Sequence, residues 1–199
     1  MDNKSVASGF TSSALTKFDY LVTDYGFYVA ATDATIVRFV STGVFVKVYN
    51  WQVSSELGVD VGLLTDGSAY GIEYDLGELV HLRGPWEYNH YRGWSGSIDL
   101  AIDHGLSYLA DELRRCGAEA LRGDLGVFDQ LAAQRERNVE AFGRYMNAMQ
   151  SRSGAEEAWS RRDYAGVVRF YDNMQQDLSP AERKKLEYSR KKWMSAKQR

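Results

Sequence analysis

The chain has 199 residues, of which 44% are hydrophobic and 26% are charged, so it can bury a core and suits one domain with a helical extension. Cys116 is the sole cysteine, which excludes an internal disulfide and a thiolate metal cluster, and we expect it to be buried. No run approaches the roughly 18 apolar residues of a membrane span, and the first residues lack a secretory-signal pattern. We therefore expect a cytoplasmic protein with no membrane partner.

Charge is unevenly distributed along the chain. The formal net charge is −3, yet residues 180–199 hold eight Lys or Arg against two Glu, a net +6 that leaves −9 for residues 1–179. A basic tail can indicate nucleic-acid binding. Leu186 and Trp193 stand one heptad apart in this tail, however, which predicts an amphipathic helix that lays both on the body and leaves its lysines in water. Because the acidic body would also repel phosphates, we do not expect a nucleic-acid partner.

The first part of the chain predicts a leader, a helix and a strand. Residues 1–13 are small and polar and are expected to form a disordered leader. From Ala14 the apolar residues recur at three- and four-residue steps, and Gly26 is placed to end this helix in a left-handed conformation. Residues 27–31 then form the first predicted strand.

The stretch 36–64 predicts successive antiparallel strands. Val44, Val46 and Val48 alternate with three other residues, the period that places successive side chains on opposite faces of a sheet. A second alternating run follows at 57–64, and residues 69–74 predict the last strand. These connections are too short for parallel crossovers, so we expect an antiparallel sheet of four to five strands.

The C-terminal half predicts helices only, which makes the fold class α+β with an N-terminal helix, a sheet and a helical C-terminal half. Two helices, over 97–120 and about 125–150, are expected to pack on the domain formed by residues 14–96. The apolar face of the second helix comprises Phe128, Leu131, Val139, Phe142, Met146 and Met149. Residues 151–199 are expected to form a helical hairpin followed by a basic terminal helix.

That hairpin resembles a single tetratricopeptide-type unit. The residues that carry the resemblance are Ala155, Ala158, Trp159, Asp163, Tyr164, Val167, Val168, Tyr171, Leu178, Pro180 and Leu186. The glycine that usually links the two helices of such a unit is replaced by Arg162-Asp163. The resemblance implies paired helices with aromatic residues wedged between them, and one unit must pack on a neighbouring element because it cannot bury its own face.

The segment 84–96 is rich in aromatic residues, lacks periodicity and predicts a loop, which is where function concentrates. Its candidate partner-binding residues are Trp86, Tyr88, His90, Tyr91, Arg92 and Trp94. Tryptophan, tyrosine and arginine dominate the energetics of protein interfaces, and they also stack on nucleotide bases. The alternative to both is that the loop folds back as the lid of the core.

Motifs for catalysis are absent from the sequence. The three histidines lack metal-ligand spacing, and neither a nucleophile elbow nor a phosphate loop occurs. Glu56 and Asp60 lie on one face of a predicted strand, roughly 13 Å apart along it, which is too far for a direct acid–base pair. We therefore predict no catalytic residue, metal site or cofactor, and assign Glu56 and Asp60 to partner binding.

Residues 18–83 resemble a group of small uncharacterised bacterial proteins of immunity type. The resemblance lies in Tyr25-Gly26-Phe27 and in residues 74–79, Tyr-Asp-Leu-Gly-Glu-Leu. It implies a protein that binds and neutralises a toxin, and it carries over no catalytic residue. The acidic side chains expected to steer a basic toxin domain are Glu56, Asp60, Glu73, Asp75 and Glu78.

The sequence therefore predicts a non-enzymatic protein-binding module of unspecified oligomeric state. Two alternatives stay open. The first is an enzyme whose site is assembled from distant residues around the 84–96 loop, such as His90, Arg92 and Glu56. The second is a helical adaptor that binds its partner through residues 151–199.

Overall fold

The computed structural model describes residues 3–51, 54, 56–64, 71–84, 91, 93–95 and 99–197. The chain divides into two compact units, residues 1–135 and residues 136–199. One helix, α7 (Leu125–Ser160), begins in the first unit and ends in the second. Among the described residues, no helix is both long enough and apolar enough to cross a membrane.

The first unit is built on an antiparallel sheet whose strands follow one another in chain order, which confirms the predicted meander. Its strands are β1 (Tyr28–Thr32), β2 (Ile36–Val40), β3 (Val44–Trp51), β4 (Glu56–Leu63) and β5 (Glu73–Asp75). The short strand β6 (Trp94–Ser95) pairs with the start of β4. The turn into β2 is closed by Asp33, whose carboxylate accepts hydrogen bonds from the backbone N–H groups of Thr35 and Ile36.

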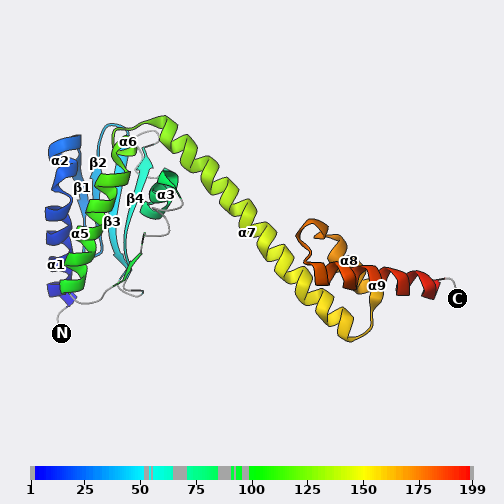
Figure 1. Ribbon diagram of the computed structural model, residues 1–199. Helices are drawn as coiled ribbons and strands as arrows, with labels where there is room; N and C mark the ends of the chain where they lie inside the picture. Colours follow the sequence, from blue (N-terminus) through cyan, green and yellow to red (C-terminus); the bar gives the residue numbers. More distant parts are fainter. Residues whose placement is uncertain are drawn as a thin grey trace. The chain divides into compact units, whose positions relative to one another are not determined.

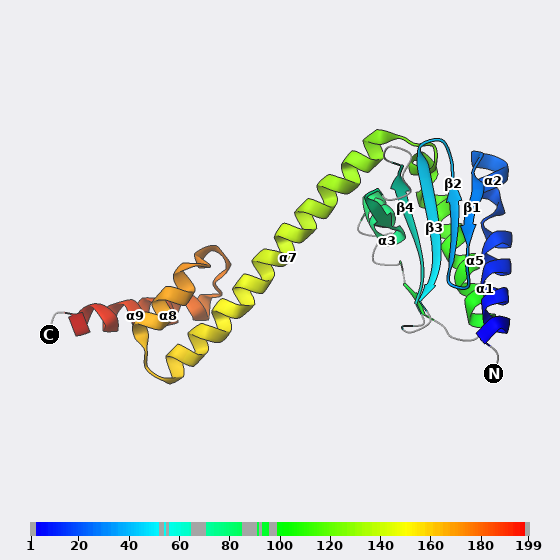
Figure 2. The same cartoon turned by 180° about the vertical axis from the view of Figure 1, so that it is seen from behind.

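Helices cover one face of this sheet, as Figure 1 shows for α1 (Asn3–Lys17), α2 (Asp19–Tyr25) and α5 (Asp99–Cys116). Gly26 ends α2 at φ 70°, the left-handed conformation expected from the sequence. The opposite face is turned toward the viewer in Figure 2, and no helix of the described residues lies over it. Two short helices, α3 (Leu76–Arg83) and α6 (Ala118–Leu121), complete the unit.

The core lies between the sheet and these helices. Val44, Val46 and Val48 are almost completely buried, as their alternation predicts, and the valines of β4 join them. Leu106, Leu109 and Leu113 of α5 face them from the helical layer. Cys116 at the end of α5 is 4% exposed, which confirms the prediction that it is buried.

Residues 3–13 do not form the disordered leader that the sequence predicts. Helix α1 begins at Asn3, and Phe10, Ala14 and Phe18 are fully buried in the core. Their spacing of four residues places them on one helical stripe. Burial of this stripe outweighs the weak helix propensity of the serine and glycine residues around it.

The second unit contains the end of α7, then α8 (Tyr164–Asp172), a 3₁₀ turn η1 (Gln175–Asp177) and α9 (Pro180–Lys197). Its buried cluster comprises Ala148, Ala155, Ala158, Val167, Val168, Tyr171, Met174, Leu178 and Leu186. Trp193 packs on this cluster together with Leu186, as the heptad spacing in α9 predicts. A helical hairpin therefore forms where the sequence predicts one.

The helix boundary predicted at residue 150 is wrong, because α7 continues through Gly154 to Ser160. Glycine has a low helix propensity, so the sequence favours a helix that ends before Gly154. Here it has a packing role: a Cβ atom at position 154 would lie 2.6 Å from the ring of Phe170 in α8. Any other residue would displace the Phe170 ring, so glycine lets this ring pack directly on α7. The boundary between the two units falls within α7, after Arg135, and not at residue 150.

Candidate functional site

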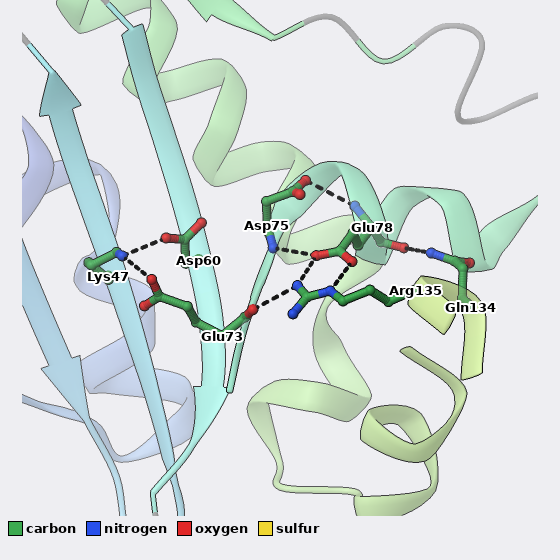
Figure 3. A network of polar contacts seen from close by, with 7 residues as sticks. All are labelled: Lys47, Asp60, Glu73, Asp75, Glu78, Gln134 and Arg135. Atoms are coloured by element: carbon green, nitrogen blue, oxygen red, sulfur yellow. Dashed lines mark hydrogen bonds and ion pairs between the residues drawn. The ribbon is translucent and has the colours of Figure 1, made fainter. Parts of the chain in front are cut away.

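A network of paired charges joins the helix-free face of the sheet to α3 and the start of α7 (Figure 3). Its first centre is Lys47 in β3, which the strand register places opposite Asp60 of β4. The Lys47 Nζ atom lies 2.7 Å from Asp60 Oδ2 and 2.6 Å from Glu73 Oε1. The side chains of Lys47 and Asp60 are only 12% and 11% exposed, so this pair is largely shielded from water.

The second centre of the network is Arg135, the last residue of the first unit. Its guanidinium donates to both carboxylate oxygens of Glu78, at 2.8 and 2.5 Å, and to the backbone carbonyl of Glu73 at 2.8 Å. It also lies over the ring of Tyr74, 4.3 Å from the ring centroid. The neighbouring Gln134 donates to the carbonyl of Glu78 at 3.0 Å. Together these contacts fasten the start of α7 to α3 and β5.

Glu73 links the two centres, through its carboxylate to Lys47 and its backbone carbonyl to Arg135. Asp75 forms a capping box beside them at the start of α3. Its carboxylate accepts from the backbone N–H of Glu78, while the Glu78 carboxylate accepts from the backbone N–H of Asp75, each at 3.1 Å. Glu78 therefore serves the cap and Arg135 at the same time.

The electrostatics of the network follow from four carboxylates that share two cations. The pKa of Asp60 is raised to about 6, chiefly by burial; Lys47 lowers it in part, and the nearby charges of Glu73 and Asp75 add to the rise. Burial alone would lower the pKa of Lys47, but its bonds to Asp60 and Glu73 outweigh this and raise it. Lys47 is therefore a fixed cation at neutral pH, which suits a positioning role better than proton transfer.

The two acidic residues that the sequence assigned to partner binding have different surroundings. Asp60 points at Lys47 within the network, whereas Glu56 is exposed at the start of β4. Trp51 pairs with Glu56 across the strands and is 46% exposed, and the ring of Tyr49 lies 5.5 Å from that of Trp51. Glu56 and Trp51 thus form an exposed acidic and aromatic corner of the sheet.

Tyr91 and Trp94, two residues of the predicted binding loop, pack against α5. Both are half-buried, and their rings lie 6.3 and 6.1 Å from the ring of Tyr108. Trp94 also sits directly over Gly105, where a Cβ atom would come within 2.3 Å of its ring. These contacts are those of a core lid, so for these two residues partner binding stays a prediction beside an observed packing role.

The other predicted loop residues, Trp86, Tyr88, His90 and Arg92, lie outside the described residues, and their roles stay predictions. Among the described residues, no group of histidine, cysteine and acidic side chains could hold a metal ion. Sequence reasoning missed Lys47, Trp51 and Arg135. The first two could have been found, because they stand in the same phase of β3 as Tyr49 and opposite to the buried valines.

Comparison with known proteins returned no matching family model, no matching curated protein and no matching solved structure. The fold and its surfaces must therefore carry any functional conclusion.

Proposed function

We propose that this chain is a non-enzymatic protein-binding module. The observation that carries the proposal is an apolar stripe on α7, formed by Val139, Phe142, Met146 and Met149. Three of these large side chains are between 48% and 66% exposed, and Met146 is half-buried. Apolar side chains gathered on one exposed surface are typical of protein interaction sites.

The spacing of the α7 apolar stripe indicates what would cover it. Steps of three, four and three residues are those of a heptad seam, which takes the apolar face of another helix. The charges beside the stripe are Glu136, Arg137, Glu140 and Arg144, which balance to zero. An amphipathic partner helix with both signs of charge fits this surface better than a strongly basic or acidic one. The stripe covers roughly 15 Å of helix, enough for three turns of a partner.

The finer proposal is that the partner is a toxin domain and that the chain is of immunity type. Its support is the charge of the first unit, which holds ten Lys and Arg against 18 Asp and Glu, a net −8. Such a charge accelerates encounter with a basic partner. Exposed Trp51 beside Glu56 supplies an aromatic anchor with an acidic neighbour. Asp60, Glu73 and Glu78 contribute less than the sequence indicated, since Lys47 and Arg135 neutralise part of their charge.

The test is capture of partners on the tagged full-length chain from extracts of its own cells, with matched variants. We expect Phe142→Ser to lose at least about tenfold of the captured partner, the loss typical of an interface anchor. Leu125→Ser is the control, because Leu125 is equally exposed on the same helix but outside the stripe. A purified chain that turns over a substrate and captures no protein would contradict the proposal and favour the enzyme alternative.

The immunity role has its own test once a partner is in hand. Expression of the captured protein should arrest growth, and co-expression of this chain should restore it. We expect Trp51→Ala combined with Glu56→Lys to weaken the rescue. The same change should also make binding of the captured protein less sensitive to salt. A captured protein that is harmless to growth would contradict the immunity role and favour the adaptor alternative, in which residues 151–199 bind the partner.

A further inference from the structure

The second unit carries a pocket lined by aromatic and basic residues. Its volume is about 600 Å³, within the range of small-molecule sites. It is lined by Trp159, Ser160, Arg162, Tyr164, Ala181, Lys184, Lys185 and Tyr188. Three aromatic rings and three cations therefore surround one hollow, which we call the aromatic–basic pocket.

The aromatic rings of the pocket pack against one another edge to face. Trp159 and Tyr164 are 6.1 Å apart between ring centroids, and Tyr188 lies 5.6 and 5.8 Å from them. All three pairs are T-shaped, so no ring stacks face to face on another. Tyr188 is 45% exposed, and Lys192 Nζ lies 5.6 Å from the centroid of its ring, so a base would stack on this ring from the side away from Lys192.

Two cations of the pocket form no ion pair with a carboxylate of the described residues. Lys185 is paired with Glu156, but Arg162 and Lys184 form no ion pair or side-chain hydrogen bond with any described residue. Four other arginines of the second unit pair with an acidic side chain, namely Arg144, Arg152, Arg161 and Arg190. The unit as a whole holds 14 Lys and Arg against nine Asp and Glu, a net +5, so an anion is favoured here.

Arg162 provides a second, independent observation. Its φ angle is 58°, and it is the only residue other than glycine with a positive φ among those described. Glycine would adopt this conformation without cost, and the sequence resemblance places a glycine at this link. Backbone strain of this kind persists where a side chain is needed, and the Arg162 side chain lines the pocket.

From these observations we propose that the aromatic–basic pocket binds a nucleotide. The phosphates contact Arg162 and Lys184, and the base lies against the rings of Tyr188 and Trp159. Stacking tolerates every base, and the pocket offers few groups that could read base edges, so purines and pyrimidines should bind alike. The nucleotide can be free or part of a single strand, since both present the same base and phosphate. This site lies beyond the proposed protein-binding function and does not depend on it.

The test is calorimetric titration of the full-length chain with ATP, UTP, tripolyphosphate, a ten-residue oligothymidylate and a poly-glutamate peptide. We expect ATP and UTP to bind with similar affinity, more tightly than tripolyphosphate, and more weakly at 200 than at 50 mM salt. Binding of ATP and UTP without tighter binding of oligothymidylate identifies a free nucleotide as the ligand. Oligothymidylate binding that is at least about tenfold tighter than ATP binding identifies a single strand. Either result supports the site.

Matched variants locate the binding. Tyr188→Ala should weaken ATP binding by about 5- to 100-fold, the cost of one stacking ring, while Tyr145→Ala should leave it unchanged, because Tyr145 is exposed on α7 outside the pocket. Lys184→Ala should weaken binding, whereas Lys191→Ala, seven residues further on the same helix, should not. Tripolyphosphate binding equal to that of ATP, tighter binding of poly-glutamate, or no binding of any nucleotide would overturn the proposal.

Discussion

Two sites of this chain, one in each unit, use arginine and lysine in opposite ways. In the first unit, Lys47 contacts two carboxylates, and Arg135 contacts one carboxylate and a backbone carbonyl. In the second unit, Arg162 and Lys184 face a pocket of aromatic rings and contact no described carboxylate. Cations whose charge is satisfied within the fold hold structure, while unsatisfied ones are available to a ligand. Stability measurements should separate the two groups.

The largest effect is expected at Lys47. Lys47→Met leaves the buried carboxylate of Asp60 without its cation, so the first unit should lose about 3–5 kcal/mol of unfolding free energy. Urea denaturation monitored by circular dichroism measures this. Arg161→Met is the control in the second unit, since its pair with Glu157 is exposed and should be worth less than about 1 kcal/mol. Equal losses in the two variants would show that shielding from water does not strengthen the pair of Lys47 and Asp60.

A smaller effect is expected at Arg135. Arg135→Ala removes the bonds to Glu78 and to the carbonyl of Glu73, which should cost about 1–2 kcal/mol after allowance for its partial exposure. Arg137→Ala is the matched control, two residues along the same helix and without an ion pair to any described residue. Hydrogen exchange should report faster opening of α3 in Arg135→Ala alone. If the amides of α3 exchange equally fast in both variants, Arg135 does not anchor the helix.

The network should also make the first unit pH-dependent. Because the pKa of Asp60 is raised to about 6 in the folded state, the folded chain binds this proton more readily than the unfolded chain does. Its contribution to stability therefore improves as the pH falls from 7 toward 4. Asp60→Asn abolishes this contribution, so the difference in unfolding free energy between variant and native chain should change by about 1–2 kcal/mol between pH 7 and pH 5. A pH-independent difference would contradict the raised pKa.

The smallest effect has the opposite sign. Arg162→Gly relieves the left-handed backbone and should stabilise the second unit by about 1 kcal/mol, while nucleotide binding falls. Arg161→Gly, at the neighbouring position with no positive φ, should be neutral or destabilising. Thermal denaturation of the two variants measures both. A stability gain without loss of binding would show that Arg162 is retained for another reason.

Local patterns in the sequence predicted the elements but not the contacts between them. The alternation of Val44, Val46 and Val48 was sufficient to predict β3 and its buried face, because period-two burial is a local property. The pair Lys47–Asp60 depends on the register of β3 and β4, which cannot be read from the two strands separately. Glu78 and Arg135 are 57 residues apart, and nothing local links them.

The two errors in element boundaries have a common physical origin. The serine- and glycine-rich stretches before Phe10 and around Gly154 have low helix propensity, and both are helical because tertiary packing outweighs propensity. The sequence predicted part of the aromatic–basic pocket, since Trp159 and Tyr164 belong to the predicted hairpin. Tyr188 and the unpaired state of Lys184 became apparent only once α9 was placed beside α7 and α8.

Because Cys116 is buried, its modification by a thiol reagent can report local unfolding of the first unit. A thiol reagent finds no other sulfhydryl in the chain, and it reaches this one only when the packing of α5 in the first unit loosens. The rate of modification therefore measures how often the first unit opens, and it is insensitive to fraying of the C-terminal hairpin. Two-state unfolding of the whole chain and independent melting of its halves would give visibly different kinetics.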